Sequence, residues 1–440
     1  MNIHAPISQT LNISQPYQGY AYAYPHKMAY RTLEQPIPLA DLWANENQEA
    51  LFLYLHIPFC EMRCGFCNLF TTAVPQQTLT EQYMNALKRQ AEQLHAILPH
   101  AHIAQLAVGG GTPTYLTETQ LSQLFAIIQL FNTDLQHLPI SVETSPKTAV
   151  SDKLTYLRQQ GVDRISIGIQ SFYDDELKSL GRPQRQADVQ RALTTIRQVG
   201  FPTLNIDLIY GGPLQTPARW RSTLKQTLVY QPEEIYLYPL YVRPLTGMDK
   251  MDQEWDEQRL QLYRLGRDFL LENGYVQLSM RHFRLADHAP RLSASYHCQE
   301  DGMIGLGCGA RSYTKTMHYA NRYAVGRRGV SEILTDWVKV ADFGMIYHGV
   351  HLNLEEQKRR FVIKSLLFAH GLEYGRYQQQ FQTTPTQDFP QLDELLAQNL
   401  ANFTNNCLKL TARGLELSDA IGPWLYSDAM KKRISGFELR

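Results

Sequence analysis

Strand-like and helix-like hydrophobic patterns alternate through the first half of the chain. Apolar runs typical of strands lie at Leu51–Ile57, Ile103–Val108, Ile140–Thr144, Arg164–Gln170, Leu204–Tyr210 and Ile235–Leu240. A segment of helical length separates each run from the next, and Leu79–Leu98 shows apolar residues at helical spacing until Pro99 ends the pattern. This alternation predicts an α/β fold with a parallel sheet or barrel. Its functional face should lie where the carboxyl ends of the strands meet their loops.

The pattern changes outside this region and divides the chain into four segments. Residues 1–49 are rich in Pro, Gln and Tyr and show no sustained period, so they should form an extended arm. After Gly247 a polar helical stretch, Asp252–Asn273, precedes expected strands at Tyr275–Phe283 and Met303–Leu306. We expect the arm at 1–49, a β/α barrel at 50–250, a barrel extension at 251–350, and a C-terminal domain at 351–440 that is helical apart from a short hairpin-like stretch and ends in a polar tail from Ser427.

Charge and hydropathy exclude several classes of function. The 440 residues contain 42 Lys and Arg against 42 Asp and Glu, without a basic run that could follow phosphates, so we expect no nucleic-acid partner. No apolar stretch approaches the ~20 residues that cross a bilayer, and the amino terminus lacks a basic segment followed by an apolar one. We therefore expect a cytoplasmic protein with no membrane partner.

Three cysteines lie close together directly after the first strand run. Cys60, Cys64 and Cys67 have the spacing C-x3-C-x2-C, and Gly65 allows a tight turn between them. Three thiolates can hold a [4Fe-4S] cluster and leave its fourth iron open to a small molecule. A zinc site is the weaker alternative, because such sites are closed by four ligands and only His56 is near enough to be a local fourth. Disulfides are weaker still in a reducing compartment.

Polar residues follow the carboxyl ends of the later strand runs. Gly109–Pro113 reads G-G-G-T-P, and bare backbone there can approach a ligand and offer N–H groups to it. Glu143 and Gln170 each end a run, and Arg182 follows a glycine; each alone is typical of a capping or solvated residue. Asp207 lies within an apolar run, so a cation or a hydroxyl group should meet its carboxylate.

The segment H-I-P-F-C-E-M-R-C-G-F-C resembles the signature of radical S-adenosylmethionine (SAM) enzymes. With the two residues before it, the start of this segment reads Y-L-H-I-P-F-C, which resembles the motif of the oxygen-independent coproporphyrinogen III oxidase family and its relatives. The resemblance implies an incomplete (β/α) radical SAM barrel with an N-terminal arm and a C-terminal helical, winged-helix-like domain. It also implies that SAM binds the open iron and is cleaved to a 5′-deoxyadenosyl radical. The balanced charge favours a lid or partner surface over DNA binding for the winged-helix-like domain.

The resemblance carries individual residues over to the site. It implies that Cys60, Cys64 and Cys67 hold the cluster and that Gly110, Gly111, Thr112 and Glu143 orient SAM. Gln170, Arg182 and Asp207 match positions that face a second SAM or the substrate, while Tyr54 and His56 should pack beside the adenosyl group or the substrate and Phe66 against adenine. A glycine-rich loop at 305–312 resembles the one that closes over SAM, and the arm residues Tyr20, Tyr22, Tyr24 and Tyr30 are candidates either for the pocket or for packing.

Departures from the family pattern leave the substrate open. The oxidases have a further cysteine where this chain has Leu69, and the haem-chaperone segment is replaced by S-Y-H-C-Q-E-D at 295–301. Tyr241 stands where the oxidases have a small residue, at the second SAM pocket. The main hypothesis is a radical SAM enzyme of the coproporphyrinogen III oxidase type acting on an unidentified small-molecule substrate, with a tetrapyrrole as one candidate and flavodoxin or ferredoxin as the reducing partner. A two-SAM radical methyltransferase and a non-enzymatic haem chaperone are the alternatives.

Overall fold

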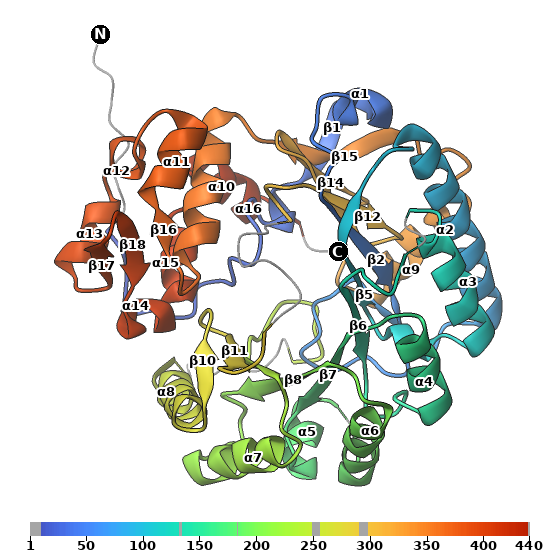
Figure 1. Cartoon of the computed structure of the whole chain (residues 1–440), viewed down its shortest axis with the longest axis horizontal. Helices are drawn as coiled ribbons and strands as arrows, with labels where there is room; N and C mark the ends of the chain where they lie inside the picture. The colour runs from blue at the N-terminus through green and yellow to red at the C-terminus, as the bar shows by residue number, and fades with distance from the viewer. Residues whose placement is uncertain (1–9, 132–133, 183, 249–255, 290–297, 439–440) are drawn as a thin grey trace.

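A curved sheet of 13 strands organises the computed structural model, which describes residues 10–131, 134–182, 184–248, 256–289 and 298–438 (Figure 1). In order across the sheet the strands are β1 (Arg31–Pro38), β15 (Met345–His351), β14 (Met317–Ala320), β13 (Arg311–Tyr313), β12 (Met303–Leu306), β2 (Leu51–Ile57), β5 (Ile103–Gly110), β6 (Ile140–Thr144), β7 (Arg164–Gln170), β8 (Thr203–Tyr210), β9 (Glu234–Pro239), β11 (His282–Leu285) and β10 (Tyr275–Gln277). Neighbours from β12 to β9 pair in parallel. Because β1 and β10 form the two edges, the sheet is an incomplete barrel, as predicted.

Helices cover the outer face of the parallel strands (Figure 1). They are α2 (Gln77–Ile97), η2 (Pro113–Tyr115), α3 (Glu118–Ile128), α4 (Ser151–Gln159), α5 (Asp174–Ser179), α6 (Gln186–Val199), α7 (Pro217–Val229) and α8 (Asp256–Glu272). The strands predicted for the first half of the chain are confirmed within two residues at each end. No helix in the described ranges is long and apolar enough to cross a membrane.

Local sequence signals set the limits of these elements. Pro58 follows β2 and removes a ladder donor. Thr117 and Gln120 form a capping box at the start of α3. Gly200, in the left-handed region at φ 75°, ends α6. On α2 the buried side chains of Tyr83 and Leu87 lie four positions apart and face the sheet.

The predicted arm is partly regular. It contains η1 (Lys27–Ala29), the edge strand β1 and α1 (Leu39–Trp43). β1 pairs with β15, and the register shifts between Thr32 and Ile37. The two prolines of β1 conceal a strand from sequence patterns, but an edge strand tolerates proline because its outer N–H groups need no ladder partner. The arm, predicted from the sequence as an extended segment, thus contains regular elements over residues 27–43.

The C-terminal domain has its own small sheet, in the order β16-β18-β17. Its elements are α10 (Leu354–Leu366), β16 (Leu372–Glu373), α11 (Tyr374–Phe381), α12 (Pro385–Asp388), α13 (Leu392–Ala397), β17 (Ala401–Thr404), β18 (Cys407–Leu410), α14 (Ala412–Glu416), α15 (Ser418–Trp424) and α16 (Asp428–Ser435). Helices with a β-hairpin agree with the winged-helix-like expectation. The domain shares a second hydrophobic core with arm residues Tyr24 and Tyr30. The four segment boundaries stay predictions.

Two expected elements differ from the structure. Tyr275–Phe283 is not one strand: β10 and β11 form an antiparallel hairpin, and Ser279 Oγ accepts the His282 N–H at its turn. The turn lacks glycine and proline, so no local signal marks it as a turn. The polar tail from Ser427 forms α16, because Ser427 caps the helix and Met430 is buried. The expected helix start at Asp252 lies outside the described residues.

A buried ion pair joins the C-terminal domain to the barrel. Arg281, at the β10–β11 turn, donates from Nη1 to Asp419 Oδ1 of α15 at 2.9 Å and contacts Oδ2 through Nη2. The side chains of Arg281 and Asp419 are 4% and 1% exposed. Tyr241 also donates to Asp419, and Arg281 lies over the ring of Tyr20, so barrel, arm and C-terminal domain meet at one carboxylate.

Asp419→Ala should lower the free energy of unfolding by about 3–5 kcal/mol, because the charge of Arg281 would stay buried without its partner. Urea denaturation measures this effect. Asp336→Ala is the control, since the Asp336 pair with Arg322 is exposed and should change stability by less than about 1 kcal/mol. Equal effects of the two substitutions would contradict this account.

Candidate active site

The three clustered cysteines lie on a loop at the carboxyl end of the barrel strands. Cys60 ends the short strand β3 (Phe59–Cys60), which pairs in parallel with β4 (Thr72–Ala73). Cys64 and Cys67 lie on the loop between β3 and β4, where the Cys67 N–H donates to Cys64 O at 3.1 Å. All three side chains are partly exposed, and all six cysteines of the chain are free thiols. The β3–β4 pair thus fixes both ends of the loop.

Gly65 fixes the middle of this loop against two barrel loops. Its N–H donates to Leu180 O at 3.1 Å, and its carbonyl accepts the Met248 N–H at 3.1 Å. A Cβ at Gly65 would lie 2.8 Å from Leu180 O, and Cβ atoms at Gly181 and Gly247 would lie 2.8 and 3.1 Å from Gly65 Cα. The backbones meet closely here, and only glycine allows this approach.

Burial and one arginine determine the thiol pKa values and the position of Cys64. Burial raises the pKa of the Cys60 thiol to about 12 and also raises the pKa of Cys64, although Arg182 opposes the shift at Cys64. Arg182 donates from Nη1 to Cys64 Sγ at 3.0 Å and from Nη2 to Gly168 O at 2.7 Å. The guanidinium therefore holds Cys64 relative to β7. Sequence reasoning placed Arg182 at a second SAM or the substrate and missed this contact.

The donor set fits an iron–sulfur cluster. Cys67 raises the pKa of both Cys60 and Cys64, so the three thiols share one neighbourhood. Three cysteine thiolates from one short loop suit this type of cluster. In the described part of the chain no group of three or more His, Cys, Asp or Glu side chains is arranged around a single metal ion.

The glycines that end β5 form a cradle beside this loop. The Gly110 N–H donates to Glu143 Oε2 of β6 at 3.0 Å. Gly110 has φ 106°, and a Cβ there would lie 2.4 Å from the His56 ring. A Cβ at Gly111 would lie 2.6 Å from Phe59 O. Thr112, the next residue, hydrogen-bonds to Cys60. These contacts bring Gly110, Gly111, Thr112 and Glu143 to the cysteine loop, as the sequence suggested.

His56 connects the cradle, the cysteine loop and the closing loop. Its Nε2 lies 2.9 Å from Phe70 O, and its Nδ1 lies 3.3 Å from Tyr54 OH. Because a carbonyl only accepts, Nε2 carries the proton and Nδ1 accepts from Tyr54. Burial lowers the pKa of His56 to about 4, so the ring is neutral. A Cβ at Gly309 of the closing loop would lie 2.9 Å from Nε2.

Two carboxyl groups lie inside the barrel. Burial and the nearby charge of Asp207 together raise the pKa of Glu143 to about 7, although the hydrogen bond from the Gly110 N–H opposes the shift. Burial also raises the pKa of Asp207 to about 6, against hydrogen bonds from Asn205 and Ser166. Asn205 Nδ2 donates to Asp207 Oδ1 at 2.8 Å. The Asn205 amide thus supplies one of the hydrogen bonds that a buried carboxylate needs.

The remaining candidates lie around the carboxyl end of the barrel strands, here called the barrel mouth. Gln170 is buried at the end of β7 and has φ 69°, a strained value of the kind found at functional sites. Phe66 packs on a small apolar cluster of Leu180, Ile209, Leu240 and Met248. Burial raises the pKa of Tyr54 far above its usual range.

The arm tyrosines separate into two groups. Tyr22 accepts a hydrogen bond from Arg311 Nη1 at 2.6 Å, and Tyr20 contacts the ring of Tyr238, so both face the barrel mouth. Tyr24 and Tyr30 are fully buried in the second core. Cys308 and Cys407 are buried as well. Residues 295–297 lie outside the described ranges.

Three cations lie at this mouth, and two of them, Lys27 and Arg311, were missed from the sequence. Burial, Lys27, Arg311 and Arg243 together lower the pKa of His26 to about 3, which places the three charges around one side chain. Their partners are neutral: Tyr323 OH for Lys27, Tyr22 OH for Arg311 and the Tyr241 ring for Arg243. They come from the arm, β13 and the loop after β9, so no local pattern joins them.

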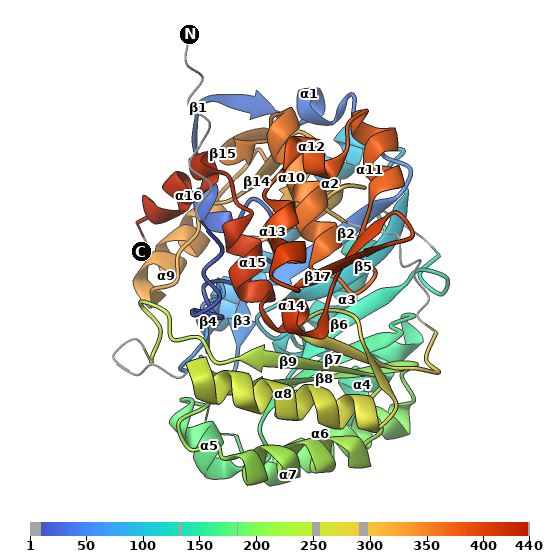
Figure 2. The ribbon, with the colours of Figure 1, turned by 90° about the vertical axis from the view of Figure 1, so that its left-hand side faces the viewer.

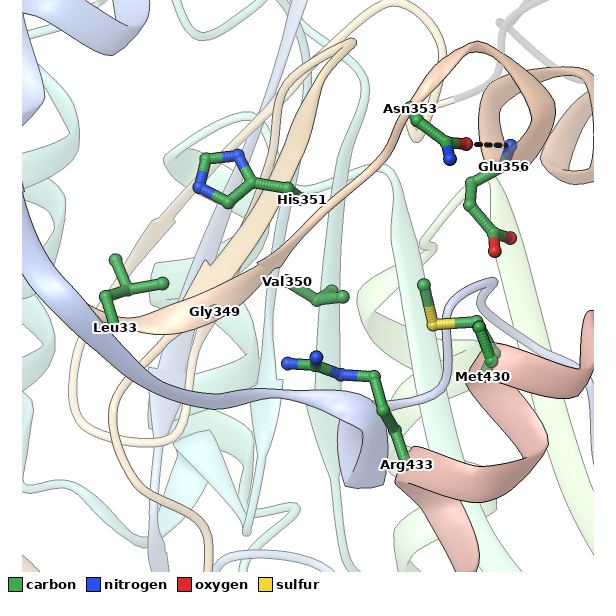
Figure 3. A pocket seen from close by; sticks show the side chains of 9 residues that line it. Leu33, Gly349, Val350, His351, Asn353, Glu356, Met430 and Arg433 are labelled. Atoms are coloured by element: carbon green, nitrogen blue, oxygen red, sulfur yellow. Dashed lines mark hydrogen bonds between the residues drawn. The ribbon is translucent and has the colours of Figure 1, made fainter.

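Two cavities lie away from this mouth. One of about 440 Å³ opens among residues near the amino ends of the barrel strands, including Gln105, Arg164 and His282, and extends to Glu143. The other, of about 340 Å³, lies between β1, β15 and α16 (Figure 3). Figure 3 shows the apolar side chains of Leu33, Val350 and Met430 around it together with polar ones from His351, Asn353, Glu356 and Arg433. Neither is lined by the cluster cysteines.

Comparison with known proteins agrees with this arrangement. Residues 54–227 match the radical SAM superfamily, and residues 352–417 match the HemN C-terminal domain. The chain is 29% identical over 395 residues to the oxygen-independent coproporphyrinogen III oxidase of Escherichia coli, covering 84% of both chains. It is 30% identical over 297 residues to the heme chaperone HemW of Synechocystis sp., covering 65% of this chain and 71% of that protein. The solved structure of the Escherichia coli oxidase aligns with a TM-score of 0.76 at 27% identity, covering 93% of this chain and 96% of that one.

The chain is therefore a member of the radical SAM superfamily. Within it, the chain belongs to the family of oxygen-independent coproporphyrinogen III oxidases and their haem-chaperone relatives.

Gly65→Ala should reduce the iron and sulfide bound after anaerobic reconstitution to less than about one fifth, because the new Cβ would force the cysteine loop away from Leu180 O. Iron and sulfide analysis measures this. The control is Gly375→Ala, whose Cβ would meet only Asn406 Nδ2 at 3.7 Å. Normal cluster content in Gly65→Ala would contradict the close-approach argument.

Glu143→Gln should change how the apoprotein's stability depends on pH. The folded pKa, about 7, exceeds the ordinary 4.5, so the wild-type carboxyl group favours folding below about pH 4.5 and loses that contribution as pH rises to about 7. Glutamine does not titrate. The unfolding free energy of Glu143→Gln minus that of wild type should therefore rise between pH 5 and pH 8.

Urea denaturation at several pH values measures this difference. Glu92→Gln, on the exposed face of α2, is the control and should give no such trend. A constant difference between wild type and Glu143→Gln across this range would show that Glu143 is not held in its neutral form.

Proposed function

We propose that this chain is a radical SAM enzyme that acts on a substrate bearing several carboxylates, with a tetrapyrrole of the porphyrinogen type as the best candidate. The observation that carries the proposal is the unneutralised cation group at the barrel mouth, Lys27, Arg243 and Arg311, next to the cysteine loop. None of the three forms an ion pair within the described residues.

The physical chemistry of these cations favours an anionic ligand. Buried charges are costly unless they are paired. Burial and Arg311 together lower the pKa of Lys27 well below its usual range. A carboxylate bound among these side chains would lower that cost, and two or three carboxylates would match the number of cations. A porphyrinogen carries its carboxylates on flexible side chains around a largely apolar ring, and the tyrosines of the arm and of β9 offer aromatic surface to such a ring.

The cofactors have residues to hold them. Cys60, Cys64 and Cys67 would ligate a [4Fe-4S] cluster, and Arg182 fixes the orientation of Cys64. Gly110, Gly111, Thr112 and Glu143 would hold SAM, with backbone N–H groups for its carboxylate and Glu143 for its ammonium group. Together these cofactors, when bound, supply the reductive cleavage of SAM to a 5′-deoxyadenosyl radical. The chain's own part is to orient both and to exclude water and oxygen.

Several side chains support this orientation. His56 keeps the cradle, Phe70 and the closing loop together in one fixed tautomer. Gln170, held at positive φ, projects from the end of β7 beside Gly168 and Arg182. Asp207, close to Glu143 in the barrel, adds a second carboxyl group for a hydroxyl or ammonium group of a ligand. The reducing partner would be an electron carrier such as flavodoxin or ferredoxin.

A haem chaperone is the second candidate, because the similarity to HemW of Synechocystis sp. reaches 30%. Tyr241 argues against a second SAM, since its hydroxyl donates to Asp419 and its ring packs on Arg243 and Tyr17. The two-SAM methyltransferase has no observation of its own in its favour and enters only as an outcome of the test.

The test is product analysis by mass spectrometry on anaerobically reconstituted protein with dithionite and SAM, with and without coproporphyrinogen III. We expect 5′-deoxyadenosine, formed faster when the porphyrinogen is present. Cys64→Ser should abolish its formation. The control is Cys407→Ser, which should not, because the Cys407 thiol only donates a hydrogen bond to His370 O in the C-terminal domain. S-adenosylhomocysteine among the products would favour the methyltransferase. No SAM cleavage together with tight haem binding would favour the chaperone.

A further inference from the structure

The surface beside the cysteine loop carries exposed apolar side chains within a group of arginines. Leu69, two residues after Cys67, is 47% exposed, and Val74, directly after β4, is 70% exposed. The Val74 N–H donates to Cys60 O at 2.9 Å, so Val74 is tied directly to a cluster ligand. Val74 also has φ 46°, which is a strained value for a β-branched residue. Exposed apolar side chains beside polar ones are typical of interaction sites.

The arginines come from α9 (Arg327–Trp337) and the segment before it. α9 contacts β4, Arg63 of the cysteine loop donates to Val325 O, and Tyr323 OH donates to Asn68 O. The start of α9 therefore lies against the cysteine loop. Figure 2 shows α9, β3 and β4 on the side of the molecule toward which the arrow of β9 points.

Two of these arginines stand where a helix disfavours them. Arg327 and Arg328 occupy the first turn of α9, which has no acidic residue, and no side chain caps its N-terminus. Cations at this end oppose the helix dipole. Both are exposed; the Arg328 side chain is 93% exposed and its ion pair with Glu332, one turn later, is exposed as well, so neither arginine serves the packing of the helix. An external anionic partner would compensate for their position.

We propose that Leu69 and Val74, together with Arg327, Arg328 and the exposed Arg322, form the docking surface for an acidic one-electron carrier protein. The inference rests on the proposed function, because a cluster held by Cys60, Cys64 and Cys67 requires an external electron. One electron leaves the reduced carrier, which is oxidised by one unit, and reduces the cluster by one unit; no bond forms or breaks. The whole chain carries no net charge, so attraction of an acidic protein depends on this local group of arginines.

Short connections join this surface to the cysteines. The Val74 N–H donates a hydrogen bond to Cys60 O, and Leu69 is two residues from Cys67. A carrier protein bound to Leu69 and Val74 would therefore lie close to two of the three cluster ligands. An apolar contact surrounded by cations suits a transient complex, in which the charges speed association and the small apolar centre excludes water.

The test compares two double variants that change the net charge by the same amount. Arg327→Glu/Arg328→Glu reverses the arginines of α9 and should fold, because glutamates in the first helical turn suit the dipole. Lys409→Glu/Arg413→Glu is the matched control, on exposed positions of the C-terminal domain. The probe is a flavodoxin, whose surface is acidic. Its affinity for the apoprotein is measured by calorimetry at low and at high salt.

We expect the α9 variant to weaken flavodoxin binding by at least about tenfold at low salt and to lose most of the salt dependence, while the control variant binds as wild type does. Equal affinities of the α9 variant and wild type would overturn the proposal. Because binding is measured without the cluster, this result does not depend on SAM cleavage.

A second measurement uses the reconstituted protein. The rate of cluster reduction by reduced flavodoxin should fall at least about tenfold in the α9 variant, while the rate with dithionite should match wild type. Slower reduction with both reductants would show damage to the cysteine loop and would overturn the docking assignment. Failure of dithionite-reduced wild type to cleave SAM would overturn the proposed function instead.

Discussion

A loop with almost no regular structure of its own must hold three thiols in fixed positions, and the rest of the molecule depends on how it does so. The means is close backbone contact at Gly65, with Gly181 and Gly247 opposite, so that loops after β7 and β9 hydrogen-bond directly to it. Side chains at these positions would separate the loop from the barrel. The β3–β4 pair and the Arg182 contact to Cys64 then fix the remaining freedom. The position of the thiols is thus determined by backbone atoms, which substitutions elsewhere disturb little.

The charged groups at this mouth divide into those that stabilise the fold and those proposed for substrate. Asp419 neutralises Arg281 and receives Tyr241, and this satisfied network attaches the C-terminal domain. Among the residues that the structure describes, Lys27, Arg243 and Arg311 lie at the same mouth with neutral partners. A buried charge with a partner stabilises an arrangement, whereas a buried charge without one favours a ligand. This contrast separates the structural cations from those proposed for substrate.

Much of the site could be predicted from the sequence because its signals are local. The cysteine spacing, the glycines that end β5 and the strand-end Glu143 stand next to each other along the chain or at corresponding strand ends. The Arg182 contact to Cys64 spans 118 positions, and the Arg281 contact to Asp419 spans 138. No periodicity encodes such contacts.

The missed elements have physical reasons of the same kind. β1 contains prolines that only an edge position tolerates, and the β10–β11 turn uses Ser279 in place of glycine. α16 is polar and gains its stability from packing Met430 on the second core. Each forms because of tertiary partners, which sequence patterns do not contain.

The two ends of the described chain hold each other. Arg433 of α16 donates to Ala29 O at 2.8 Å, and Arg31 donates to Arg433 O in return. During synthesis the barrel strands leave the ribosome long before α16 exists, so these two contacts of the arm form late. The order of the chain thus separates formation of the barrel from attachment of the arm to α16.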